Sequence, residues 1–127
     1  MKNLTPNLMV YNVNDTIDYY ETYFNFKLVQ TVPEEGQFQW AMVNAGNVNL
    51  MFQTIDSLRN DLPQFEDLEP GGGLTLFFEV DDVEKLYNSV KDNVEVIVEF
   101  HKTFYGMNEF SIRDLNGFLL TFAEPAE

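Results

Sequence analysis

Apolar and polar positions along the first half of the chain predict short strands around one helix. Residues 8–13 form an apolar run typical of a strand. A helix should follow, because apolar residues then recur at helical spacing: Ile17, Tyr20, Tyr23 and Phe24. Asn14 or Asp15 is expected to cap it, since a short polar side chain can accept hydrogen bonds from a helix's first amides. The next strands are predicted at residues 27–32, 38–43 and 48–54.

The same order restarts in the second half. A strand is predicted at residues 74–80, a helix capped by Asp81 or Asp82, a strand at residues 94–100, and a final hairpin within residues 105–124. The stretch between the halves carries prolines and a run of three glycines, with one helical turn expected near residues 57–60. We therefore expect a single domain with a first module at 1–55, a connector at 56–73 and a second module at 74–127.

The two halves align as an internal repeat. Val13-Asn14-Asp15 matches Val80-Asp81-Asp82 at an offset of 67, and residues 40–52 match residues 110–122 at an offset of 70. The second alignment makes Phe110 the counterpart of Trp40 and superposes the two hairpin turns. Both halves thus follow the order strand, helix, strand, strand, strand. Two such halves can curl around a shared cavity.

Composition narrows the function classes. The chain has 127 residues, with 7 Lys and Arg against 21 Asp and Glu, a formal charge of −14, which disfavours binding to nucleic acid or to anionic membranes. This charge serves solubility or attracts a cationic ligand. The 12 Phe and 6 Tyr predict an aromatic core or an apolar pocket. The absence of cysteine excludes disulfides and thiolate chemistry, and without an apolar run of membrane length or a signal core we expect a cytoplasmic protein.

Three stretches resemble the vicinal oxygen chelate superfamily, which includes glyoxalase I, the extradiol dioxygenases and the bleomycin-resistance proteins. They are LMVYNVNDTIDYYETYFNF, LTLFFEVDDVEKLY and YGMNEFSIRDLNGFLLTF. The family commonly has Arg-Asp-Pro-Asp-Gly at the last turn, where this chain has Arg113-Asp114-Leu115-Asn116-Gly117, and the Asn-Gly pair keeps the turn chemistry. The resemblance implies an α+β fold of two βαβββ modules in tandem, forming a cup-shaped, curved mixed sheet with the helices outside.

The resemblance also implies where a metal would bind. Enzymes of the family hold one divalent ion with His, Glu or Gln side chains from the first and last strands of each module. Those positions fall here at Leu8, Met51, Thr75 and Thr121, none of which is a ligand of that kind. The only histidine, His101, follows the sixth strand and is expected to lie away from them. We therefore expect no metal and no other cofactor.

The same strand positions predict a ligand-binding face, because residues two apart on a strand share a face. Leu8, Val10 and Asn12 should line the cup in the first strand. Residues that could contact a ligand are Trp40, Met51, Gln53, Thr75, Phe77, Glu79, Tyr105 and Thr121. Each of these residues could instead fill a core or a loop. Asp81, Asp82 and Asp114 fit helix capping and turn bracing better than catalysis.

The sequence therefore favours a metal-free, homodimeric binding protein similar to the bleomycin-resistance proteins, which sequesters a hydrophobic or cationic small molecule without catalysis. Antibiotic resistance would be a role of that kind. One alternative is a glyoxalase-like or lyase-type metalloenzyme whose non-standard site uses Glu79 and Gln53. Another is a dimeric module whose cup is filled by its own side chains.

Overall fold

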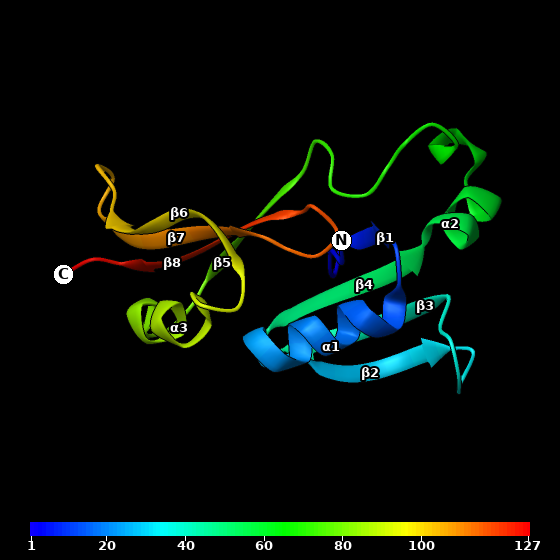
Figure 1. Ribbon diagram of the computed structural model, residues 1–127, viewed down its shortest axis with the longest axis horizontal. Coiled ribbons are helices and arrows are strands. Elements are labelled where there is room, and N and C mark those ends of the chain that lie inside the picture. The colour runs from blue at the N-terminus through cyan, green and yellow to red at the C-terminus, as the bar shows by residue number, and fades with distance from the viewer. The chain divides into compact units, whose positions relative to one another are not determined.

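The computed structural model describes all 127 residues, which divide into two compact units, Met1–Pro70 and Gly71–Glu127. The first unit contains a four-stranded sheet in the order β1-β4-β3-β2, in which only β1 and β4 run parallel. Helix α1 lies along this sheet (Figure 1). The elements of this unit are β1 (Asn7–Val10), α1 (Val13–Phe24), β2 (Lys27–Val32), β3 (Trp40–Ala45), β4 (Val48–Thr54), α2 (Ile55–Asp61) and the 3-10 helix η1 (Pro63–Phe65).

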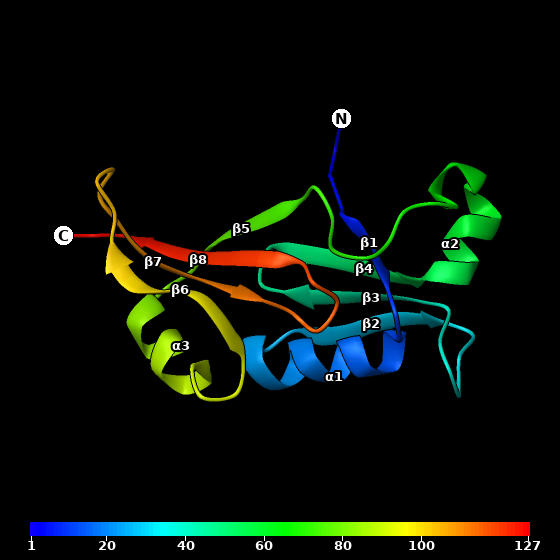
Figure 2. The same cartoon turned by 45° about the horizontal axis from the view of Figure 1, so that its top comes forward.

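The second unit repeats this arrangement with the sheet order β5-β8-β7-β6, in which only β5 and β8 run parallel. Its elements are β5 (Thr75–Glu79), α3 (Val83–Val90), β6 (Glu95–Lys102), β7 (Met107–Arg113) and β8 (Leu119–Pro125). Figure 2 shows α3 beside the strands of this sheet. The α+β fold of two tandem βαβββ modules predicted from the sequence is confirmed. No helix in the structure has both the length and the apolar character needed to cross a membrane.

The N-cap of helix α1 lies two or three residues before the predicted cap. Asn12 is the N-cap, and its Oδ1 accepts from the Asp15 amide at 2.8 Å. Asn14, one of the two predicted caps, lies inside the helix and holds a loop instead. Its Nδ2 donates to Gly36 O and its Oδ1 accepts from the Phe38 amide. The expectation failed because four adjacent residues, Asn12 to Asp15, contain three with capping side chains.

Helix α3 begins as predicted, with Asp82 as its N-cap and the Lys85 amide as donor. The Glu124 carboxylate at the end of β8 also accepts from the amides of Asp82 and Val83. A carboxylate is stabilising there because the first amides of a helix have no intrahelical partner. The chain thus ties the start of α3 to the end of its own sheet.

Aromatic side chains fill the space between each helix and its sheet. In the first unit, Tyr20 of α1 packs on Phe52 of β4 with ring centroids 5.0 Å apart. In the second unit, Tyr87 of α3 packs on Phe110, which stacks on Phe122. Phe52, Phe110 and Phe122 are all buried. These Phe and Tyr rings therefore form core.

The structure corrects the repeat offset in the first part of each unit. The two N-caps, Asn12 and Asp82, give an offset of 82 − 12 = 70 residues. Strand pairing gives the same value, because Leu8 lies opposite Phe52 and Phe78 lies opposite Phe122. The predicted offset of 67 was therefore wrong by three residues. An odd error along a strand moves every side chain to the opposite face.

The second hairpin turn is longer than the first, so the two turns do not superpose as predicted. In the first turn Ala45 pairs with Val48, which leaves a loop of two residues. In the second turn the Asp114 amide donates a hydrogen bond to Phe118 O, which leaves a loop of three residues. The Asp114 carboxylate braces this turn, as expected, by accepting from the amides of Asn116 and Phe118 at 2.9 Å.

Part of the predicted connector is ordered structure. Helix α2 occupies Ile55–Asp61, which includes the single helical turn that was expected, and η1 follows it. Arg59 donates to the carbonyl oxygens of Phe65 and Leu68 and forms an ion pair with Glu69 at 3.5 Å. The arginine therefore organises the chain that follows α2.

Gly71 packs directly against the longer hairpin turn, and we expect Gly71→Ala to destabilise the protein. A Cβ at Gly71 would lie 2.7 Å from the Gly117 carbonyl group, at a backbone φ of +92°. Gly73→Ala is the matched control, because Gly73 has a φ of +70° and open space around it. Both variants should lose about 1–2 kcal/mol from the left-handed backbone. Gly71→Ala should lose about 1–3 kcal/mol more from overpacking, measured by urea unfolding. Equal losses would contradict this packing role.

Candidate functional site

Each sheet has one face covered by its helix and an opposite face, here called the open face. In the first sheet, Leu8, Phe52 and Ala41 lie in one cross-strand row on the helix-covered side. Leu8 and Val10 are therefore core residues, and the expectation that they line the ligand-binding face is wrong. The open-face residues of β1 are Asn7 and Met9, which pair with Met51 and Gln53. Asn12 is the helix cap.

The eight residues proposed for ligand contact all avoid the helix-covered faces. Trp40, Met51 and Gln53 lie on the open face of the first sheet, where Trp40 pairs directly with Gln53. Thr75, Phe77, Glu79 and Thr121 lie on the open face of the second sheet. Tyr105 lies in the loop between β6 and β7. The structure thus brings them together as two groups, one in each unit.

One cross-strand row is equivalent in the two sheets but differs in chemistry. In the first sheet it contains Met9, Gln53, Trp40 and Val32. In the second sheet it contains Glu79, Ala123, Glu109 and His101. The counterpart of Trp40 is therefore Glu109 and not Phe110, because of the extra residue in the second hairpin loop. His101, which we expected to lie away from the site positions, is the cross-strand neighbour of Glu109.

Glu109 is the most unusual polar group of this row. Its side chain is only 8% exposed, although it belongs to an open face. Its Oε1 accepts from the Tyr105 hydroxyl at 2.7 Å. Its Oε2 is buried and has no hydrogen-bond partner in the chain. A buried carboxylate oxygen without a donor is costly, so this atom marks a place where an additional donor would be favourable.

The Tyr105 hydroxyl responds to the same carboxylate. Its hydrogen bond to Glu109 raises the pKa of Tyr105 above its ordinary value, and desolvation and the negative charge of Glu109 act in the same direction. The physical cause is that Glu109 accepts from the neutral phenol and repels the phenolate. Tyr105 therefore stays protonated and continues to donate to Glu109 across the physiological pH range.

The neighbouring row on the second open face is less polar. It contains Phe77, Thr121, Ser111 and Val98. The Ser111 and Thr121 hydroxyls lie 2.7 Å apart and satisfy each other, while the Phe77 ring is 58% exposed. Apolar surface thus lies beside the buried carboxylate, a combination typical of small-molecule sites.

Gln53 on the first open face has a structural role. Its side chain is 6% exposed, accepts from Asn7 Nδ2 at 2.8 Å, and donates to Ser57 Oγ and Asp61 Oδ2 at 2.9 and 2.8 Å. These bonds use most of its hydrogen-bonding capacity and fix α2 against β4. Gln53 is thus already engaged, whereas Trp40 and Met51 remain partly exposed.

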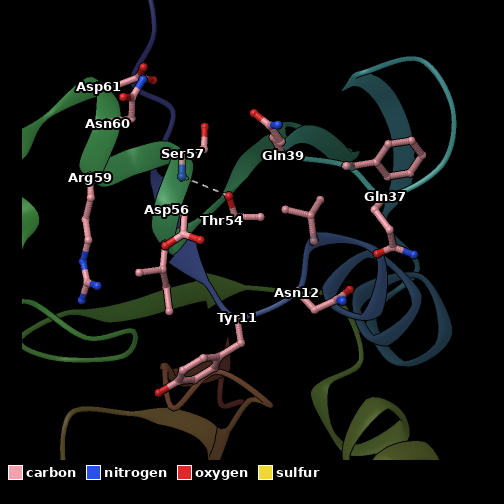
Figure 3. A pocket seen from close by; sticks show the side chains of 13 residues that line it. Tyr11, Asn12, Gln37, Gln39, Thr54, Asp56, Ser57, Arg59, Asn60 and Asp61 are labelled. Atoms are coloured by element: carbon pink, nitrogen blue, oxygen red, sulfur yellow. Dashed lines mark hydrogen bonds between the residues drawn. The ribbon is translucent and has the colours of Figure 1, made fainter.

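A separate pocket of about 830 Å³ lies at one end of the first sheet (Figure 3). It contains none of the eight residues proposed from the sequence. Its walls come from the start of α1, the loop before β3 and helix α2. The lining residues are Tyr11, Asn12, Val13, Gln37, Phe38, Gln39, Thr54, Ile55, Asp56, Ser57, Arg59, Asn60 and Asp61.

The donor set does not fit the metal that the family's enzymes hold. Met51 and Thr121 occupy equivalent open-face positions, and their neighbours in β1 and β5 are Asn7 and Phe77. Histidine, glutamate and glutamine are absent from these four positions. No group of three or more His, Asp or Glu side chains lies close enough together to hold an ion. Glu79 and Gln53, considered for a shifted site, lie in different units.

Two features were missed from the sequence. Glu109 is not among the residues predicted to contact a ligand, because alternation along β7 could not be anchored until the pairing with β8 was known. The pocket of the first unit depends on the side chain of Asn14, which was assigned to capping. The signal that could have found it is the polar stretch Gln37-Phe38-Gln39 before a strand.

Comparisons with known proteins agree with the fold. The family model described as the Glyoxalase/Bleomycin resistance protein/Dioxygenase superfamily matches residues 4–122. The chain is similar to the crystal structure of TioX from Micromonospora, with 18% identity, a TM-score of 0.78, and 98% and 99% of the two chains covered. A comparison with curated protein sequences gave no match.

Two further solved structures are similar. A protein of unknown function from Agrobacterium tumefaciens has a TM-score of 0.82 at 19% identity, with 98% of this chain and 94% of that chain covered. A glyoxalase/bleomycin resistance protein/dioxygenase family enzyme from Burkholderia phytofirmans has a TM-score of 0.78 at 16% identity, with 95% and 96% covered. At these identities the likeness shows the fold alone.

We predict that Glu109→Gln lowers the pKa of Tyr105 toward its ordinary value. The substitution removes the negative charge and weakens the acceptor that holds the phenol proton. The measurement is a pH titration of the Tyr105 ring carbon by NMR in the wild type and the variant. Glu84→Gln is the control, because Glu84 is an exposed residue of α3. An unchanged Tyr105 pKa in Glu109→Gln would contradict the contact.

Proposed function

Because the chain belongs to the glyoxalase/bleomycin resistance protein/dioxygenase superfamily, we propose that it is a metal-free binding protein for a small organic cation with apolar surface. The proposed ligand binds on the open face of the second sheet. The protein holds it by apolar burial and carboxylate attraction and makes or breaks no covalent bond.

The observation that carries this proposal is the second oxygen of Glu109. Oε2 is buried and receives no hydrogen bond, while Oε1 already receives one from Tyr105. A protonated amine, or a nitrogen that carries a hydrogen, would satisfy this oxygen and its charge together. Glu79 lies in the same cross-strand row and adds a second, exposed carboxylate.

The apolar part of the ligand would contact the side chains beside the carboxylates. Phe77 offers an exposed ring on the same open face as Glu79 and Glu109. Aromatic rings suit cations as well as apolar groups, because the ring face carries negative electrostatic potential. The chain's charge of −14 would draw such a ligand toward the protein.

We further propose that the protein works as a homodimer and by sequestration. Binding a toxic compound without altering it would confer resistance to that compound, as expected of a bleomycin-resistance-like protein. The alternative, a glyoxalase-like or lyase-type metalloenzyme, requires a donor set that is not gathered in either unit. It would be supported by a tightly held divalent ion.

The first test uses benzyltrimethylammonium, an aromatic cation, as the probe in a calorimetric titration. Glu109→Gln should weaken binding about tenfold or more, because it removes the charge of the buried acceptor. Glu79→Gln should weaken binding less, since Glu79 is exposed. Glu84→Gln removes the same charge from α3 and should leave affinity unchanged. An equal loss of affinity in all three variants would indicate a response to net charge alone and would overturn the assignment of the site to Glu109.

The second test concerns the metal. Incubation with the chelator EDTA, followed by dialysis, should leave the melting temperature unchanged, because the proposed protein binds no stabilising ion. Adding Zn²⁺, Ni²⁺ or Mn²⁺ afterwards should also have no effect. A drop of several degrees that one of these ions reverses would favour the metalloenzyme.

A further inference from the structure

The pocket of the first unit is held in shape by contacts made within that unit. Asn14 fixes the loop before β3 through Gly36 O at 3.0 Å and the Phe38 amide at 2.9 Å. Gln53 fixes α2 through Ser57 and Asp61. The Thr54 amide also donates to Gln39 O at 2.9 Å, which joins the two walls. The pocket is therefore formed before any ligand arrives.

Polar side chains on both walls are left without partners in the chain. Gln37 and Gln39 stand on one wall, and Asp56 and Asn60 stand on α2 opposite them (Figure 3). None of these four side chains makes a hydrogen bond or ion pair within the structure. Each carboxamide offers two donors and one acceptor. The pocket thus presents donors and acceptors in mixture.

The charges around the pocket restrict what it can hold. Arg59 is its only cationic residue, and its guanidinium is occupied by Phe65 O, Leu68 O and Glu69. Asp56 and Asp61 would repel an anion. One oxygen of Asp61 already accepts from Gln53, so Asp56 is the only carboxylate of the pocket with both oxygens free to bind a cation. The other unpaired polar groups are the carboxamides of Gln37, Gln39 and Asn60. This set suits groups that both donate and accept, which hydroxyls do.

Aromatic surface completes the pocket. Tyr11 is 59% exposed and Phe38 is half-buried, and both line the cavity. The C–H face of a sugar ring can pack on such rings while its hydroxyls reach the amides. The volume of about 830 Å³ lies within the range of small-ligand sites.

We propose that this pocket is a second binding site, for an uncharged, hydroxyl-rich molecule of one or two sugar rings. It is distinct from the open-face site, shares no residue with it, and goes beyond the proposed function. Gln37, Gln39 and Asn60 bind the hydroxyls, and Asp56 accepts from one of them.

The test is an NMR titration of the full chain, with assigned backbone amides, using glucose and trehalose as probes. We expect at least one of them to cause saturable shifts confined to residues 37–39 and 54–61, at millimolar affinity. Gln39→Ala and Asn60→Ala should each weaken that binding by several-fold, because each removes hydrogen bonds to the sugar. Gln64→Ala is the control, since Gln64 is exposed and lies outside the pocket.

Two charged relatives of the probe sharpen the result. Glucuronate should bind more weakly than glucose, because its carboxylate meets Asp56. If glucosamine binds but neither glucose nor trehalose does, the carboxylates make the site, and the proposal is overturned. Absence of saturable shifts with both neutral sugars would overturn it as well. Glu109→Gln should leave sugar binding unchanged, so failure here is separable from failure of the open-face proposal.

Discussion

Each unit of this chain builds a four-stranded sheet but supplies only one long helix to cover it, and the rest of the structure follows from that constraint. Because side chains alternate along a strand, half of them pack against the helix. In the first unit these include Leu8, Phe52 and Leu50, and in the second Phe110 and Phe122. The other half must be placed on a face that its own long helix does not cover. That face is where chemistry can differ between the units.

The two open faces have diverged at equivalent positions. The row of the first sheet holds Trp40, Gln53 and Met9, and Gln53 is committed to anchoring α2. The equivalent row of the second sheet holds Glu79, Glu109 and His101. A repeat that served only to build a core would not need a buried carboxylate in this row. The buried Oε2 of Glu109 has no hydrogen-bond partner, and this burial costs folding free energy that a purely structural residue would not need to cost.

The order of the elements was predicted correctly from the sequence. The predictions were wrong where a shift of a few residues decides which residue caps a helix or which face of a sheet a side chain occupies. Strands β2 and β4 were predicted to their ends, because turns and loops bound them clearly. The cap of α1 was placed at Asn14 or Asp15, although Asn12 does the capping. The resulting offset error of three residues is odd, so it carried Leu8 to the wrong face of its sheet. The eight proposed site residues escaped this error because they were anchored in β3, β4, β5 and β8 or in a loop.

The pocket and Glu109 could not be found from patterns alone, for different reasons. The pocket forms where Asn14 draws the loop before β3 toward α1, a side-chain contact across 24 residues. The burial of Glu109 depends on its pairing with Ala123 and His101 and on the Tyr105 hydroxyl, none of which lies adjacent in sequence. Family resemblance supplied the fold, but fold does not determine function.

We propose that the protein binds an organic molecule without a metal, with Glu109 as the acceptor. Native mass spectrometry of wild type and Glu109→Gln, both purified without chelator, tests it most directly because it shows subunit number, metal and adducts together. We expect a metal-free dimer that carries an organic adduct in the wild type and loses it in Glu109→Gln. One divalent ion per subunit in the wild type would instead indicate a metalloenzyme and overturn the proposed metal-free binding.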